Sequence, residues 1–412
     1  MALNTYYKWR FIRQVRLRFA WDFSNKFYPW NPVKRYLNVS NVLHKQKAKN
    51  AILKHKIVAE KYTDILKKNE DNPYIDKRYK NCTYVIHDDV VELVLQNISS
   101  DLPKEDALIV EINPGFGILS KALLESGVSQ LKLIEDNRVF LPHLLELSEL
   151  YPGKVQLINK DFYRMFKIPE DSESENNLSQ IIEGAKIRKW NEESPLKMFL
   201  ILPFDKNYFL RRMIYSLECE NSIYRLGRVE FLMFVSGKEY AYMIAGPKDN
   251  FLKYRQVSVL YQLFFDIELI EKIPKEHFFT IFKNKKRKRA FYDDSNLYFI
   301  KIIPKKDVFN DNMTLQKLAE FIYFVRLNLS VRKSLILPAL ERLIPDCGPH
   351  FIKYGLAVYT RFGDVTPEQI LDIFNIFISL PGYNDGLFKD LFSDELSKKH
   401  QDETCDLETN IE

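Results

Sequence analysis

The chain has 412 residues, of which 46% are hydrophobic and 14% aromatic, and its formal net charge is +6. This size and composition exclude a wholly disordered chain and leave room for two folded domains. No apolar run reaches the ~18 residues that a membrane-spanning helix needs. Four scattered cysteines without a CxxC pair argue against a disulfide framework or a zinc site. We therefore expect a soluble protein of a reducing compartment, without a bound metal.

The N-terminus is strongly basic, because up to Ala59 it holds thirteen Lys and Arg and only one acid, Asp22. As a helix, residues 8–19 place several apolar side chains near one face. An amphipathic, Arg-rich and acid-poor start is typical of a mitochondrial presequence. We predict a presequence and basic arm over residues 1–50, followed by a Lys-rich connector over 51–80. An arm that grips nucleic acid is the alternative interpretation.

The segment from Glu111 to Gly117, Glu-Ile-Asn-Pro-Gly-Phe-Gly, is the centre of the predicted fold. An apolar run of strand type, 107–110, precedes it, and apolar residues at helical spacing follow it. A strand, a turn with two glycines and a helix form a nucleotide cradle, since glycine allows positive φ and a close approach of ligand to backbone. The next predicted strand, 131–134, ends in Glu135, where such folds place an acid on a ribose hydroxyl.

Strand and helix patterns alternate around this cradle. A helical pattern over 84–98 includes Asp88 and Asp89, acids that suit a helix start. Apolar runs predict further strands at 155–158, 196–202, 229–235, 263–270 and 298–303, with helices at 208–217 and from 238 onward. Residues 169–195 are polar and acidic, which predicts a flexible surface insertion.

The C-terminal part has a different pattern. From Thr314 onward, apolar residues recur on helical stripes, and after Asp394 acidic residues dominate. We therefore predict an α/β domain over 81–304, a small helical domain over 305–393 and an acidic, disordered tail over 394–412.

Together these features resemble the S-adenosylmethionine-dependent rRNA adenine dimethyltransferase family. The likeness is strongest at Glu111 to Gly117, Glu135, Asp161-Phe162, Leu202-Pro203-Phe204 and 238–260. Within the family, Asn113 to Gly117 and Ser222 to Glu230 are similar to the mitochondrial transcription factor B branch. The resemblance implies a Rossmann-like class I methyltransferase domain followed by an all-helical C-terminal domain.

The resemblance also implies which residues border S-adenosylmethionine. Gly115 and Gly117 border its methionine part, Glu135 binds the ribose hydroxyls, and Asp161 accepts from the adenine amine. The full implied set is Glu111, Asn113, Gly115, Gly117, Glu135 and Asp161. From the residues alone, Glu135 as a solvated strand end and Asp161 as a helix N-cap remain open alternatives.

The sequence departs from the family at the predicted catalytic position. Active members carry Asn or Asp directly before Leu-Pro-aromatic, whereas Ile201 stands here before Leu202, Pro203 and Phe204. The aromatic ring stacks on a flipped base, but an Ile side chain accepts no hydrogen bond from the adenine amine. Losing one preorganised polar group typically costs about 100- to 1,000-fold in rate.

Two further departures point the same way. Asn113 replaces the first glycine of the cradle, and a basic run from Lys283 stands where active relatives carry a Pro-rich substrate loop. We expect methyl transfer to be weak or lost, and binding of S-adenosylmethionine stays an open question.

If methyl transfer is lost, the fold can still serve as a scaffold that binds nucleic acid. We hypothesise a mitochondrial transcription initiation factor that binds mitochondrial RNA polymerase and promoter DNA in the matrix nucleoid, as a monomer and without a membrane; the family implies the polymerase. Candidate phosphate contacts are Lys283, Lys285, Lys286, Arg287, Lys288 and Arg289, with Arg225 and Arg228 as weaker ones. A solvated loop is the alternative for the basic run. The alternative functions are a mitochondrial small-subunit rRNA adenine dimethyltransferase and a catalytically inactive rRNA-binding protein.

Overall fold

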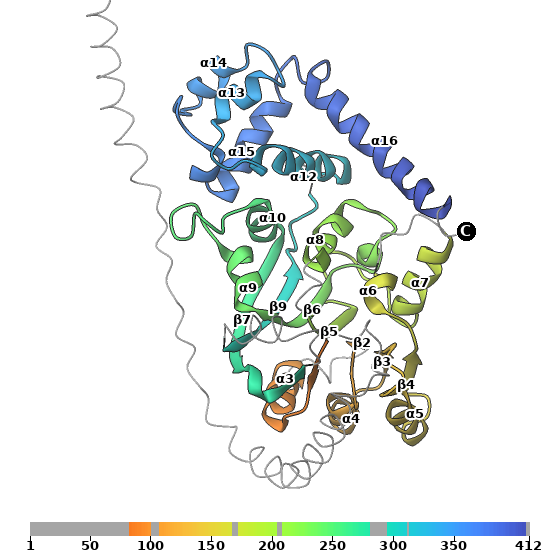
Figure 1. The fold of residues 1–412 in the computed structure, drawn as a ribbon. Helices are drawn as coiled ribbons and strands as arrows, with labels where there is room; N and C mark the ends of the chain where they lie inside the picture. The colour runs from red at the N-terminus through yellow and green to blue at the C-terminus, as the bar shows by residue number, and fades with distance from the viewer. Residues whose placement is uncertain are drawn as a thin grey trace, which may run out of the picture.

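A computed structural model of the chain describes residues 82–99, 107–166, 172–203, 208–280, 295–310 and 313–408 (Figure 1). The predictions for the presequence, the connector, Phe204 and the basic run from Lys283 to Arg289 lie outside these residues. No helix of the described part is both long and apolar enough to cross a membrane.

A seven-stranded sheet forms the centre of the molecule. Its order is β4 (Val155–Ile158), β3 (Leu131–Ile134), β2 (Leu108–Ile112), β5 (Leu196–Ile201), β6 (Val229–Ser236), β9 (Asn296–Pro304) and β7 (Phe265–Pro274). The strands from β4 to β6 pair in parallel, whereas β9 is antiparallel to both of its neighbours. The central strands β2 and β5 are buried along their whole length, which explains why they are continuous apolar runs.

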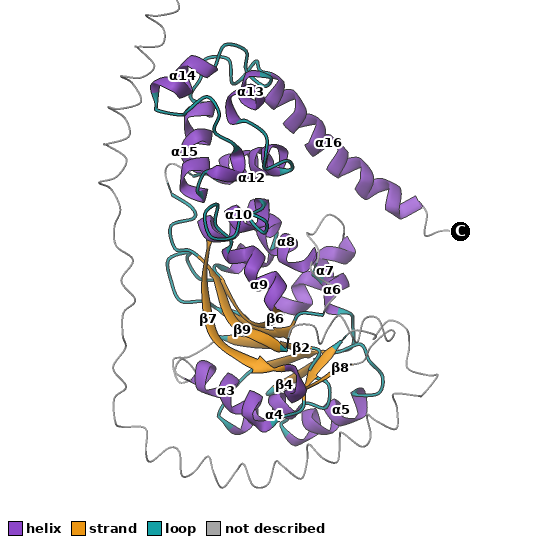
Figure 2. Cartoon of the chain, turned by 60° about the vertical axis from the view of Figure 1, so that its left-hand side comes forward, coloured by secondary structure: helices purple, strands orange, loops and turns teal. Residues whose placement is uncertain are grey.

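Helices cover both faces of this sheet (Figure 2). One layer contains α3 (Asp88–Ser99), α4 (Ile118–Glu125) and α5 (Leu141–Leu150), and the other contains α6 (Phe162–Met165), α7 (Ser172–Ile182), α8 (Tyr208–Tyr215), α9 (Gly237–Ile244) and α10 (Gln256–Phe264). Neighbouring strand residues face opposite layers, so Ile109 and Val110 belong to separate apolar clusters. The strand order reverses between β2 and β5, and ligands of open α/β sheets bind outside the carboxyl ends of the strands at such a point.

A separate two-stranded antiparallel sheet lies beside the cradle. It pairs β1 (Thr83–Val85) with β8 (Phe278–Thr280), and the hydroxyl oxygens of Thr83 and Thr280 lie 2.9 Å apart. The 3-10 turn η5 (Lys275–His277) leads into β8. This pairing corrects the helical pattern predicted from residue 84, because the helix begins at Asp88 and a strand precedes it.

The C-terminal part is helical, as predicted. It contains α12 (Leu315–Leu329), α13 (Ile336–Glu341), α14 (Gly348–Lys353), α15 (Pro367–Ile378) and α16 (Leu387–Glu408). The Thr314 hydroxyl accepts from the Lys317 N–H and starts α12. The rings of Phe264 in α10 and Phe321 in α12 lie 5.8 Å apart, and one apolar cluster runs through both parts of the chain. The α/β class with C-terminal helices is therefore confirmed.

Two expectations about segments need correction. The insertion predicted as flexible contains α7, which buries Leu178, Ile181 and Ile182 at helical spacing. Helix α16 continues past Asp394 to Glu408, and the disordered tail over 394–412 stays a prediction. The strand predicted at 263–270 begins at Phe265, since the two residues before it end α10, and it continues to Pro274. The many polar and acidic residues of α7 led to the prediction of a flexible insertion, although three apolar residues form a short stripe on the helix.

Candidate functional site

The glycine turn after β2 has the conformation that the sequence predicts. Asn113, Gly115 and Gly117 have positive φ angles of 54°, 62° and 73°. Asn is among the non-glycine residues that most readily adopt this region, which explains how it replaces a glycine here. The Asn113 N–H donates to the Ile134 carbonyl at 2.9 Å, so the turn is fastened to the end of β3.

Glu135 lies beneath this turn and is only 1% exposed. Its carboxylate accepts from the Gly115 N–H at 3.2 Å and from the Asn137 N–H at 3.0 Å. Burial raises the pKa of Glu135 to about 8, because desolvation of the charge outweighs these backbone hydrogen bonds. The alternative of a solvated strand end is therefore wrong. The Glu135 carboxylate, which was expected to bind the ribose hydroxyls, instead accepts hydrogen bonds from the backbone of its own chain.

Glu111 is a buried residue that stabilises the cradle. It is buried on β2, and its carboxylate accepts from the Ser120 hydroxyl of α4 at 2.6 Å. Burial raises the pKa of Glu111 to about 7. Its hydrogen bond joins β2 to α4 across the turn, so Glu111 acts here as a structural bridge.

Asp161 adopts the N-cap role that the residues alone left open. Its carboxylate accepts from the Tyr163 N–H at 2.9 Å at the start of α6, and the Arg164 Nε lies 3.6 Å from it. Asp161 also lines a polar hollow of about 420 Å³ together with Asp136, Arg138 and Lys160. The hollow thus includes the residue that was expected to contact the adenine.

Tyr84 is a cradle residue that the sequence analysis missed. It lies on β1, is 1% exposed and packs its ring 4.7 Å from that of Phe140. Its position depends on the pairing of β1 with β8, almost 200 residues away in the sequence. An aromatic residue in a strand-like run beside the acidic helix start is the only local signal.

The degenerate catalytic position is apolar and closed. Ile201 ends β5, is 6% exposed and packs in the cluster that contains Phe199 and Phe234. The Leu202 N–H donates to the Phe234 carbonyl at 2.9 Å, and the Tyr163 hydroxyl lies 3.5 Å from the Ile201 carbonyl. The side chain at position 201 offers no acceptor for an amine.

The two weaker phosphate candidates are engaged within the protein. Arg228 is 4% exposed and donates to the carbonyls of Trp190, Pro304 and Glu192 at 2.8, 3.2 and 2.9 Å. This corrects the prediction for Arg228, which is a structural residue. Arg225 is paired with Glu175 of α7 at 2.5 Å, with about a quarter of its side chain exposed.

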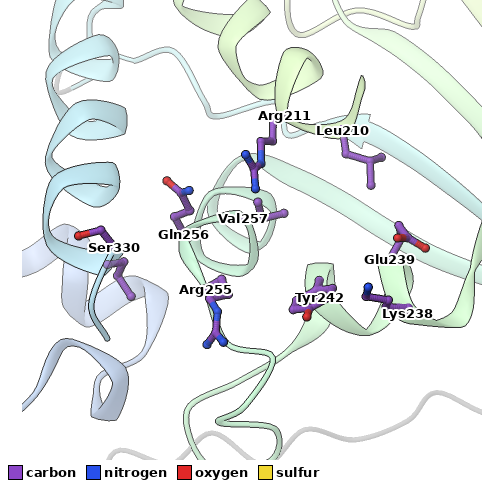
Figure 3. Close-up of a pocket in the computed structure, with 10 residues that line it drawn as sticks. Leu210, Arg211, Lys238, Glu239, Tyr242, Arg255, Gln256, Val257 and Ser330 are labelled. Atoms are coloured by element: carbon purple, nitrogen blue, oxygen red, sulfur yellow. The ribbon is translucent and has the colours of Figure 1, made fainter. Parts of the chain in front are cut away.

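A crevice between the two parts of the chain presents a second candidate site (Figure 3). Its volume is about 330 Å³, and its lining comes from α8, α9, α10 and the end of α12. The lining includes the cations Arg211, Lys238 and Arg255, the side chain of Tyr242, and Gln256, whose buried Oε1 has no partner. Burial also raises the pKa of Glu239. Because four elements supply these residues, no local sequence pattern reveals the site.

One group of possible metal ligands occurs among the described residues. His87, Asp89 and His277 each place a ligand atom within 4.8 Å of the others. The two imidazole rings stack with centroids 4.2 Å apart and planes 12° apart. Stacked rings direct their in-plane lone pairs side by side, whereas a tetrahedral metal site needs them to converge. This arrangement is not a preformed metal centre.

Comparisons with known proteins agree with the family resemblance. A family model described as Ribosomal RNA adenine dimethylase matches residues 77–379. The chain is 26% identical over 356 residues to "Dimethyladenosine transferase 2, mitochondrial" of Drosophila melanogaster, covering 74% of this chain and 76% of the relative. The Mus musculus protein of that name is 31% identical over 246 residues, covering 57% and 62%. A solved dimethyladenosine transferase from Plasmodium falciparum has TM-score 0.42 and 10% identity, covering 69% of this chain and 93% of that one. The resemblance expected from the sequence is confirmed.

Proposed function

Because this chain belongs to the ribosomal RNA adenine dimethylase family, we propose that it is a member that has exchanged methyl transfer for transcription initiation in mitochondria. The relatives named above carry mitochondrial names, and the resemblance of Ser222 to Glu230 implies the second metazoan paralogue of mitochondrial transcription factor B. In this proposal the chain binds mitochondrial RNA polymerase at promoters in the matrix nucleoid and stabilises the melted DNA strand.

The observation that carries the proposal is the burial of Ile201 at the catalytic position. An adenine amine has its lone pair delocalised into the ring, so a methyltransferase must accept the amine protons to make the nitrogen nucleophilic. Ile201 lies in an apolar cluster and supplies no acceptor. Without that preorganised group the transition state loses its main electrostatic support.

The crevice between the α/β and helical parts supports the DNA-binding side of the proposal. Arg211 and Lys238 are exposed there, and Tyr242 lines the same hollow. Cations that follow phosphates and an aromatic ring that stacks on bases are the usual parts of a single-strand site. The basic run from Lys283 to Arg289 supplies further candidate phosphate contacts from outside the described residues.

Runoff transcription on a linear mitochondrial promoter with the cognate polymerase tests this function. We expect transcription to depend strongly on the chain on duplex template and weakly on pre-melted template. A parallel assay measures methylation of an rRNA hairpin by the same preparation. No stimulation on either template would remove the transcription role.

Family membership also favours a second candidate, a mitochondrial small-subunit rRNA adenine dimethyltransferase. Robust methylation of the hairpin supports this candidate. Co-purification with ribosomal subunits, without methylation and without polymerase, favours an inactive rRNA-binding protein instead.

A further inference from the structure

The space above the glycine turn is filled by a side chain of the same chain. A Cβ atom added to Gly115 would lie 2.8 Å from Cδ1 and 3.3 Å from Cγ of the Tyr84 ring. The ring thus rests directly on the backbone of the turn, at a separation that only the hydrogen of glycine permits. In a nucleotide cradle the glycine is kept small so that a ligand can approach this closely, and here the approaching group is Tyr84.

Tyr84 is held in this position from several sides. Its ring contacts Phe140, which in turn meets Phe116 edge-on with centroids 4.9 Å apart. Its hydroxyl hydrogen-bonds to the side chain of Asn137, a buried residue of the loop after β3. The strand that carries Tyr84 is paired with β8 on both sides of this residue, because Thr83 and Val85 are opposite Thr280 and Phe278. Tyr84 therefore belongs to an anchored strand.

The buried polar groups of the cradle already have hydrogen-bond partners within the chain. Both oxygens of Glu135 accept from backbone N–H groups. Among the described residues, the buried polar side-chain atoms that lack a partner include none from Glu111, Glu135 or Asn137. These internal hydrogen bonds satisfy the cradle without a ligand, since a buried acceptor left unpaired costs about 1–3 kcal/mol.

We propose that Tyr84 is an internal replacement for the cofactor, and that this chain does not bind S-adenosylmethionine. The Tyr84 ring supports the turn where the methionine and ribose parts of the cofactor would lie, and Glu135 bonds the turn from below. The residues of the cradle therefore do not fit the cofactor that the family implies. The polar hollow at Asp161 remains open, but it offers only the adenine side of the site. The inference concerns the cradle alone and is independent of the proposed transcription role.

Calorimetric titration of the full chain with S-adenosylhomocysteine tests the proposal. We expect no saturable binding by the natural chain at about 1 mM ligand, and one-site binding by Tyr84→Ala that is at least about 100-fold tighter. Tyr84→Phe is the matched control, because it keeps the ring and is expected to stay closed. In the Tyr84→Ala background, Glu135→Gln is expected to lower the regained affinity about tenfold, which assigns binding to this cradle.

Two outcomes overturn the proposal. Micromolar binding of S-adenosylhomocysteine by the natural chain would show that the Tyr84 side chain moves out of the site when the ligand binds. Absence of binding by both the natural chain and a folded Tyr84→Ala variant shows that another group closes the site. Because Tyr84→Ala removes a buried ring, Tyr84→Leu serves as a second opening variant that keeps apolar packing on Phe140. Thermal unfolding with and without ligand reports folding and binding for every variant.

Discussion

At the scale of single residues, two buried glutamates make the stability of this protein depend on pH. Burial raises the pKa of Glu111 to about 7 and that of Glu135 to about 8, from the ordinary value of 4.5. The folded state thus holds protons that the unfolded state releases. The stability from this difference is complete below pH 4.5 and is lost as the pH rises through about 8.

We therefore predict that the free energy of unfolding falls between pH 5 and pH 8.5. The loss is on the order of 3 kcal/mol for Glu111, since each unit of pKa shift corresponds to about 1.4 kcal/mol. Glu111→Gln should reduce this dependence by that amount in urea unfolding measured at both pH values, and the part that comes from Glu135 should remain. Glu149→Gln, at an exposed site of α5, is the control that should leave the slope unchanged. A slope that is the same in Glu111→Gln and the natural chain contradicts the assignment.

Ile201 is a second residue whose environment determines the outcome of a substitution. Ile201→Asn restores the amide of the active family but places it in an apolar cluster. We predict a loss of about 2–4 kcal/mol of stability, because the amide is desolvated without a partner. Ile201→Val, which removes one methylene, should cost about 1 kcal/mol.

The same Ile201→Asn variant should not methylate an rRNA hairpin, because Tyr84 still fills the cradle. A methylation assay with a radiolabelled methyl donor measures this. Methylation by Ile201→Asn would mean that position 201 alone separates this chain from the active family, and that the cradle opens.

At the scale of elements, Arg228 connects three parts of the α/β domain. It lies just before β6 and donates to carbonyls of the segment after α7 and of the end of β9. We predict that Arg228→Ala destabilises the fold by about 3 kcal/mol, since three carbonyls lose their donor. Arg225→Ala, in the same motif but with a partly exposed ion pair, should cost less than about 1 kcal/mol.

Urea unfolding of these two arginine variants distinguishes the roles. Equal, small losses would show that the three hydrogen bonds of Arg228 contribute little to stability and would contradict its structural role. A large loss for Arg228→Ala alone supports its assignment as a structural residue.

At the scale of the whole molecule, the crevice between the two parts of the chain brings cations from separate elements together. We predict that Arg211→Ala and Lys238→Ala each weaken single-stranded DNA binding and reduce the slope of log affinity against log salt by about 0.7. Lys121→Ala is the control, because it removes an exposed cation from α4 on the opposite face of the sheet. Fluorescence anisotropy across a salt series measures the DNA affinity of all three variants. Equal slopes in the crevice variants and the control would exclude the crevice as a phosphate site.

The sequence by itself determined the features whose physical cause is local. The strand, glycine turn and helix around Gly115 follow from apolar runs and φ preferences, and Glu135 follows from the length of one βα unit. The lack of an acceptor at Ile201 is a property of the side chain itself. The capped α12 could also be predicted, because a cap and an apolar stripe are local signals.

Only the tertiary structure decided what these residues contact. Tyr84 covers Gly115 because β1 pairs with β8, with 197 positions separating Thr83 from Thr280. The sequence predicts that Arg228 is a surface cation. In the structure it is buried, because β9 and the segment after α7 enclose it. The residue type determines the chemistry of a side chain, but segments that are distant in the chain determine whether it is exposed to solvent or to a ligand. The cradle could therefore be recognised from the sequence, whereas its closure could not.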